Sequence, residues 1–318
     1  MLSRVAERVY WTGRYIERAE STARLVNAYT NQVLDLPKGT EPGWRTLVDI
    51  SGTTDLFEGH YQNADERNTV KFLLIDAFNP ASILSSLAMA RENVRTTRDV
   101  LPTEAWEHTN ELYLYAKNHV QSGLARRNRF YFLKNILFRC QQVTGLLDGT
   151  MSHDAAYDFV RAGRNLERAD MTTRIVDSAV FLLLPRKDEP GEYDNILWVS
   201  VLKSLSAFQM YRQHVRNRVV GDEVVRYLLK DDQFPRSVSH SVSVAELSLN
   251  NLPRNEAPLR SVARLRRRLN EAQTDKMSLE QLHAFIDELQ AELNTTHESI
   301  SNTWFNLDQP MQQQAQSS

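Results

Sequence analysis

Two segments of the sequence carry the same pattern of charged residues, and this pattern is the first candidate for chemistry. We call these segments the first and the second stripe. The first stripe consists of Gly13, Arg14, Glu17, Arg18, Ala19, Glu20 and Arg24, and the second of Gly163, Arg164, Glu167, Arg168, Ala169, Asp170 and Arg174. Side chains three or four positions apart lie side by side on a helix, so each stripe predicts a row of paired ions.

The sequence leaves three interpretations of the stripes open. In the first, they are solvated rows of ion pairs, each pair adding about 0.2–0.5 kcal/mol. In the second, Glu17 and Glu167 each meet an arginine of the other stripe, and the resulting buried network fixes how two halves of the chain dock. In the third, the stripes line a cleft where Arg14, Arg24 and their counterparts bind an anionic group, while the glutamates hold these arginines or bind an amine.

A row of three arginines is the second candidate site. Arg91, Arg95 and Arg98 follow one another at spacings of four and three, which places their guanidinium groups on one face of a helix. Guanidinium groups bind phosphate and carboxylate through paired hydrogen bonds. The row therefore predicts a site for an anion or an acidic partner, and the alternative is a solvated face paired with Glu92 and Asp99.

Motifs for other kinds of chemistry are missing or incomplete. The sequence has no Walker loop, GxSxG, HExxH or GxGxxG motif, so we predict no nucleotide or other cofactor. Glu280 and His283 have the Glu-x-x-His spacing of di-iron bundles but no second copy, so we predict no metal. The basic run at residues 264–268 is typical of a solvated face, and the net charge of −2 gives no reason to expect nucleic acid.

The elements that must position these residues are helices. Apolar residues recur at helical spacing and no stretch alternates as a strand would, so we predict an all-α fold. Asn79 is predicted to cap a helix that begins at Pro80 and ends near Val100. The lone cysteine, Cys140, falls in an apolar stretch and is predicted to be a buried thiol.

The two halves of the chain resemble each other beyond the stripes. Residues 10–27 and 160–177 align without a gap and share eight of eighteen residues. More faintly, the segment NPASI at 79–83 corresponds to FPRSV at 234–238. We therefore predict two tandem, diverged copies of a multi-helix unit, packed as a pseudo-twofold bundle. The copies span residues 1–149 and 150–308, and a Gln- and Ser-rich tail at 309–318 is predicted to be disordered.

Cysteine content and apolar runs bear on the compartment. A single cysteine fits a reducing environment. The first residues show no apolar signal region, and the longest apolar run, residues 179–185, is far shorter than the ~20 residues that span a bilayer. We therefore expect a cytoplasmic protein that does not enter a membrane.

Three segments carry a resemblance to a known family: MLSRVAE at 1–7, YWTGRYIERAE at 10–20 and ARENVR at 90–95. They resemble the bacterial alpha-E domain family, an all-helical family named for its Glu-Arg signature, and the resemblance extends to about residue 305. Members of that family are typically encoded beside, or fused to, a circularly permuted ATP-grasp protein and often a transglutaminase-like peptidase. The resemblance thus implies a system that makes peptide-like amide bonds.

Residues and resemblance together give a leading hypothesis. In it, the chain binds a carboxylate or acyl-phosphate substrate, or the ATP-grasp ligase itself, through Arg91, Arg95, Arg98 and the two stripes. Two other hypotheses stay open. One is an autonomous enzyme with Glu17 or Glu167 as general base, and the other is a structural adaptor whose stripes only hold the halves together.

Overall fold

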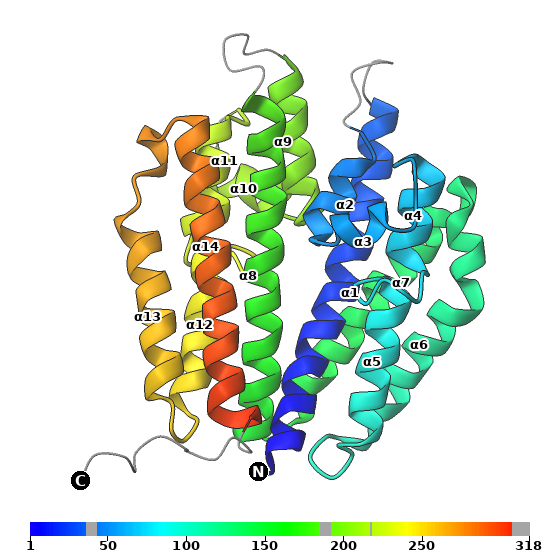
Figure 1. Ribbon diagram of the computed structural model, residues 1–318, viewed down its shortest axis with the longest axis vertical. Helices are drawn as coiled ribbons and strands as arrows, with labels where there is room; N and C mark the ends of the chain where they lie inside the picture. Colours follow the sequence, from blue (N-terminus) through cyan, green and yellow to red (C-terminus); the bar gives the residue numbers. More distant parts are fainter. Residues whose placement is uncertain (36–42, 185–191, 217, 307–318) are drawn as a thin grey trace.

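The computed structural model describes residues 1–35, 43–184, 192–216 and 218–306 (Figure 1). This described part of the chain forms fourteen α-helices and no β-strand, which confirms the all-α prediction. The helices are α1 (Ser3–Asp35), α2 (Arg45–Ser51), α3 (Thr54–Glu58), α4 (Glu66–Leu74), α5 (Ile83–Arg95), α6 (Thr103–Leu124), α7 (Arg126–Thr150), α8 (Ala155–Leu183), α9 (Glu192–Ser204), α10 (Phe208–Val215), α11 (Gly221–Lys230), α12 (Val238–Asn250), α13 (Glu256–Glu271) and α14 (Leu279–Ile300).

The two stripe helices, α1 and α8, form the centre of the molecule. They begin at the same end and diverge toward the other (Figure 1). Each approaches the other at a glycine: a Cβ on Gly13 would lie 2.2 Å from the Val160 carbonyl oxygen, and a Cβ on Gly163 would lie 2.2 Å from the Tyr10 carbonyl oxygen. Only glycine allows backbones to come this close, so the glycine of each stripe sets how tightly the two helices cross.

The remaining helices surround this pair. In Figure 1, α1–α7 occupy one side of the molecule and α8–α14 the other. Helices α5 and α7 pack against α1, whereas α12 and α14 pack against α8. Two shorter helices reach across, because α2 also packs against α8 and α9 against α1. The side chains of the stripes are therefore enclosed from several directions.

The predicted start of α5 is wrong by three residues. Its N-cap is Ser82, whose hydroxyl accepts a hydrogen bond from the Ser85 amide, and the helix begins at Ile83 and ends at Arg95. Asn79 is fully buried and instead closes the preceding turn, donating to the Phe72 carbonyl and accepting from the Ala81 amide. The side chain of Asn79 makes its hydrogen bonds within this turn and is therefore not available to cap α5.

Helix α12 begins in the same manner as α5. Its N-cap is Ser237, which accepts from the His240 amide. Each of these caps follows a proline and one variable residue, which is Ala81 before α5 and Arg236 before α12. This residue distinguishes the two otherwise similar segments that lead into α5 and α12.

One hydrophobic core extends through both halves of the chain. Cys140 is completely buried in it, which confirms the prediction, and burial raises the pKa of its thiol. The predicted boundary at 149/150 falls at the end of α7, and the predicted tail at 309–318 lies outside the described residues. None of the helices within the described ranges has the length and apolar character needed to cross a membrane.

Candidate functional site

The two stripes bond to each other across the α1–α8 crossing. Arg18 donates to both carboxylate oxygens of Glu167, at 2.5 and 3.0 Å, and Arg14 Nε donates to Glu167 Oε2 at 2.7 Å. In the opposite direction, Arg168 Nη2 donates to Glu17 Oε2 at 2.7 Å. The Glu17 and Glu167 side chains are only 1% and 2% exposed. These glutamates therefore lie inside the protein, each facing arginine from the other stripe.

Neighbouring arginines keep both glutamates ionised. Burial alone would raise the pKa of Glu17, but Arg168 and Arg236 outweigh it and hold that pKa well below its ordinary value. Burial acts on Glu167 in the same direction, and Arg18 and Arg14 nevertheless lower its pKa to about 2. A carboxylate with so low a pKa is a weak proton acceptor at neutral pH. The arrangement suits fixed countercharges better than general bases.

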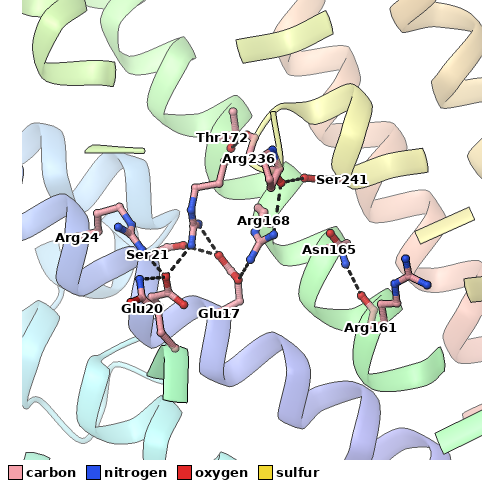
Figure 2. Close-up of polar contacts among 12 residues, drawn as sticks. Glu17, Glu20, Ser21, Arg24, Arg161, Asn165, Arg168, Thr172, Arg236 and Ser241 are labelled. Carbon is pink, nitrogen blue, oxygen red and sulfur yellow. Dashed lines mark hydrogen bonds and ion pairs between the residues drawn. The ribbon is translucent and has the colours of Figure 1, made fainter. Parts of the chain in front are cut away.

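We call the first group of ions the Glu17 cluster: Glu17, Glu20, Arg24, Arg164, Arg168 and Arg236. Figure 2 shows the side chain of Arg236 reaching from the start of α12 to two glutamates of α1. Its Nη1 donates to Glu17 Oε1 at 2.6 Å and its Nη2 to Glu20 Oε1 at 2.7 Å. Arg24 also donates to Glu20. With Arg236 only 11% exposed, the space between the stripes is filled by protein at this end.

Other contacts hold the Arg236 segment in place. The Thr172 hydroxyl donates to the Arg236 carbonyl at 2.9 Å, and Arg168 Nη1 donates to the Pro235 carbonyl at 3.4 Å. Both donors come from α8, so the second stripe fixes the backbone from which Arg236 extends. Arg164 contributes only through its charge, since its Nε is buried without a hydrogen-bond partner.

We call the second group of ions the Glu167 cluster: Arg14, Arg18, Glu167, Asp170 and Arg174. Here the residue between Pro80 and the N-cap Ser82 is Ala81, whose side chain is too short to reach Glu167. The cluster instead borders a cavity of about 330 Å³, which all five of its residues and Ala81 line. That volume lies at the low end of typical ligand pockets, about 300–1,000 Å³. The Glu167 cluster is therefore the candidate functional site.

Arg174 and Asp170 form the more accessible part of this site. Arg174 Nε donates to Asp170 Oδ2 at 2.9 Å, and the two side chains retain 29% and 20% exposure. The turn after α2 presses on the guanidinium group, because a Cβ on Gly52 would lie 2.5 Å from Arg174 Nη1. Gly52 has a φ of +67°, a left-handed conformation that also favours glycine. The turn thus positions Arg174 at the cavity.

Helix α14 supplies an uncharged wall of the cavity. His297 lines it, and its Nδ1 lies 3.0 Å from the Tyr10 hydroxyl. Burial, with a further effect of Arg14, lowers the pKa of His297 to about 4, so the imidazole is neutral at pH 7. The charges at the cavity are then the three guanidinium groups and two carboxylates of the Glu167 cluster, a surplus of one positive charge.

The three arginines of the predicted row do not converge on one point. Arg91 and Arg98 lie over the same ring, that of Trp106, at 5.2 and 4.1 Å from its centre. Arg95 turns to its helix neighbour Glu92, at 2.6 Å, and is 50% exposed. None of the three is among the residues that line the cavity. A separate anion or partner site at this row remains a prediction.

The carboxylates and histidines also form one small group with metal-ligand geometry. Within the described residues, single ligand atoms of Asp177, His283 and Asp287 lie within 4.8 Å of one another. His283 Nδ1 is 2.6 Å from Asp177 Oδ1, and this contact raises the pKa of His283. An ion pair between the two side chains accounts for the arrangement.

Sequence reasoning named all five residues of the Glu167 cluster but missed Ala81, Arg236 and His297. The signal for the first two was present in the correspondence of residues 79–83 with 234–238, where alanine and arginine stand at the matching place. Nothing in the sequence pointed to His297, which lies far along the chain and meets the cavity only through the packing of α14.

Comparison with known proteins gives a family. A family model described as a predicted alpha-helical domain with a conserved ER motif, Alpha-E, matches residues 1–305. Uncharacterized proteins of Mycobacterium bovis and Mycobacterium tuberculosis are 22% identical over 326 aligned residues, which cover 94% of this chain and 36% of theirs. The chain thus spans about a third of the length of these curated relatives. No solved structure matches it. With nearly its whole length matched, and a Glu-Arg pair in both stripes, the chain belongs to the Alpha-E family.

Proposed function

We propose that the chain binds a small carboxylate or acyl-phosphate substrate in the cavity beside the Glu167 cluster, as a component of an amide-forming system. The observation that carries the proposal is a cavity of about 330 Å³ lined by three guanidinium groups and only two carboxylates. An anionic ligand group would offset the surplus positive charge, and a partly enclosed site strengthens such an interaction relative to water.

The arginines have hydrogen-bond donors left for such a ligand. Each guanidinium group has five N–H donors. Arg174 donates within the described part of the chain only from Nε, to Asp170. Arg14 donates from Nε to Glu167, and a further hydrogen bond joins it to Tyr10. The remaining N–H groups of both arginines are available to a carboxylate or phosphate, which arginine bonds in a paired geometry.

Substrate binding fits the site better than general-base catalysis by Glu17 or Glu167. Glu17 is closed off by Arg236, and the pKa of Glu167 is about 2. The sequence offers no phosphate-binding loop, so the proposal assigns ATP to a partner. The resemblance of the chain to alpha-E proteins suggests a circularly permuted ATP-grasp protein as that partner, and a transglutaminase-like peptidase as a further component.

We also propose that the halves of the chain arose as copies of one unit. The reciprocal bonding of Glu17 and Glu167 to arginines of the other stripe supports this, as do the reciprocal glycine contacts of α1 and α8. In this view the two clusters began as equivalents, and Arg236 now occupies at the Glu17 cluster a place that stays open beside the Glu167 cluster.

Binding of simple anions tests the function. Isothermal titration calorimetry with succinate and with acetyl phosphate is expected to give binding that Arg174→Ala weakens. Arg226→Ala is the matched control, because Arg226 is an exposed arginine away from the cavity and from the predicted row, and it should leave binding unchanged. Absence of binding by either anion at millimolar concentration would contradict a substrate site here.

Association with the ligase is tested separately. A tagged chain is expected to co-purify with an ATP-grasp protein encoded beside it, and amide formation by the mixture should require both proteins. If the two proteins fail to associate at micromolar concentration, with and without ATP, the assignment to an ATP-grasp system is wrong, whatever the anion titrations show.

A further inference from the structure

The side chain that closes the Glu17 cluster indicates what the open cluster accepts. Arg236 brings a guanidinium group between two carboxylates of one helix face, Glu17 and Glu20, and bonds to both (Figure 2). It does so from the residue that follows a proline and precedes the N-cap of α12. The Glu17 cluster therefore shows how this fold binds a guanidinium group beside the first stripe.

The corresponding position beside the Glu167 cluster has no arginine. Ala81 follows Pro80 and precedes Ser82, the N-cap of α5, and both Pro80 and Ala81 line the cavity together with Glu167 and Asp170. An alanine side chain ends at Cβ, so the space that an arginine would cross is part of the cavity. The two carboxylates at this end are spaced along α8 as Glu17 and Glu20 are along α1.

Asp170 retains capacity to accept hydrogen bonds. Its counterpart Glu20 accepts from Arg24, from Arg236 and, at 3.4 Å, from Gln141. The carboxylate of Asp170, by contrast, accepts within the described residues from Arg174 alone, through Oδ2. A carboxylate accepts up to about four hydrogen bonds. Asp170 is also 20% exposed, so a ligand can approach it.

The remaining charges require a second group on the ligand. A lone cation would add to the surplus positive charge of the Glu167 cluster, whereas a carboxylate on the same molecule would pair with the terminal nitrogens of Arg174 and Arg14. The small volume, about 330 Å³, limits the two groups to one compact molecule.

We infer that the cavity binds a small molecule carrying one guanidinium group, one carboxylate and no further charge, as in 4-guanidinobutyrate. Its guanidinium group lies against Asp170, as Arg236 lies against Glu20, because Arg14 and Arg18 already occupy both oxygens of Glu167. Its carboxylate lies against Arg174 and Arg14. This inference rests on the proposed function, because it names the substrate class of the same site.

Calorimetry with matched probes tests the inference. 4-Ureidobutyrate has the shape of 4-guanidinobutyrate with a neutral urea in place of the guanidinium group, and butylguanidine keeps that group but lacks the carboxylate. 4-Guanidinobutyrate is expected to bind at least about tenfold more tightly than either, a difference of about 1.4 kcal/mol. Ala81→Arg should abolish 4-guanidinobutyrate binding, because the new side chain would occupy the place of the ligand's guanidinium group.

A second variant keeps the test decisive should Ala81→Arg fail to fold. Asp170→Asn should bring the affinity for 4-guanidinobutyrate down to that for 4-ureidobutyrate, while binding of succinate persists. Equal affinities of the unaltered chain for these two probes, or unchanged 4-guanidinobutyrate binding in folded Ala81→Arg, would overturn the inference. Binding of succinate without binding of 4-guanidinobutyrate would overturn it and leave the proposed function intact, whereas binding of no probe would overturn both.

Discussion

Apart from Arg236, the Glu17 cluster and the Glu167 cluster draw matching residues from the two central helices, yet Arg236 bridges the glutamates of the first and a cavity of about 330 Å³ borders the second. The difference comes from the residue before the cap of a neighbouring helix, Arg236 in one case and Ala81 in the other. A buried carboxylate surrounded by arginines therefore does not by itself mark a ligand site or a structural network. The role of such a carboxylate depends on whether another side chain of the protein, as Arg236 does, fills the space beside it.

The largest effect is expected at the crossing that both clusters share. Gly13→Leu should destabilise the chain by about 5 kcal/mol or more, because its side chain would collide with the Val160 backbone and force α1 and α8 apart. Gly145→Leu is the control, since it changes an exposed glycine of α7 that has nothing within 4 Å of an added Cβ. Urea unfolding followed by circular dichroism measures both. Similar stability of the two variants would show that the crossing tolerates separation.

Removing one charge from each cluster tests their difference directly. Glu17→Gln leaves Arg168 and Arg236 buried without their shared countercharge, and should cost about 3–5 kcal/mol. Glu167→Gln should cost less, since Arg18 is 21% exposed, against 10% for Arg168 and 11% for Arg236. The free energies of unfolding of the two variants measure these costs. An equal loss of stability in both would contradict a difference in solvent access between the Glu17 cluster and the Glu167 cluster.

Opening the closed end should reproduce the cavity. Arg236→Ala is expected to destabilise the chain by about 2–4 kcal/mol, because it leaves a space between Glu17 and Glu20 and removes a donor from each. Low millimolar methylguanidinium should then raise the melting temperature of this variant more than it raises that of Arg95→Ala. Methylammonium serves as the control cation. Failure of methylguanidinium to act selectively would indicate that the pocket cannot bind a free guanidinium group.

A smaller effect is expected on pH dependence at the wall of the cavity. Burial lowers the pKa of His297 to about 4, so the unfolded chain takes up this proton at a higher pH than the folded chain. The contribution of neutral His297 is complete above about pH 6.5 and is lost as pH falls from there toward 4. His297→Gln should therefore flatten the fall in stability over this range. Gln290→Ala, which changes the same wall of the cavity at a residue that does not titrate, should leave the slope unchanged.

Much of the fold could be predicted because helix formation depends on nearby residues. The helical period and the burial of Cys140 follow from local composition, and the stripes are recognisable as charged faces of two long helices. The prediction failed at Asn79, where the side chain had two possible backbone partners. The buried hydrogen bond from Asn79 to the Phe72 carbonyl favoured the turn over the helix cap. Helix and capping propensities do not take this contact into account.

The candidate site was predictable only in part. The sequence marked Glu167 and the arginines around it, but it marked Glu17 and its neighbours equally, and it gave more weight to Arg91, Arg95 and Arg98, none of which lines the cavity. The two stripes have nearly the same local sequence, so local reasoning assigns them the same role.

The sequence by itself determined that two charged helical stripes exist and that each offers a glutamate and several arginines. Only the tertiary structure decided that these stripes cross at their glycines and that a guanidinium group from residue 236 reaches one of them. The physical reason is distance along the chain. Hydrogen bonds within a helix join residues four apart, whereas the contact that closes the Glu17 cluster joins residues 219 positions apart. Packing of whole helices brings such residues together, and with them it determines where a cavity remains.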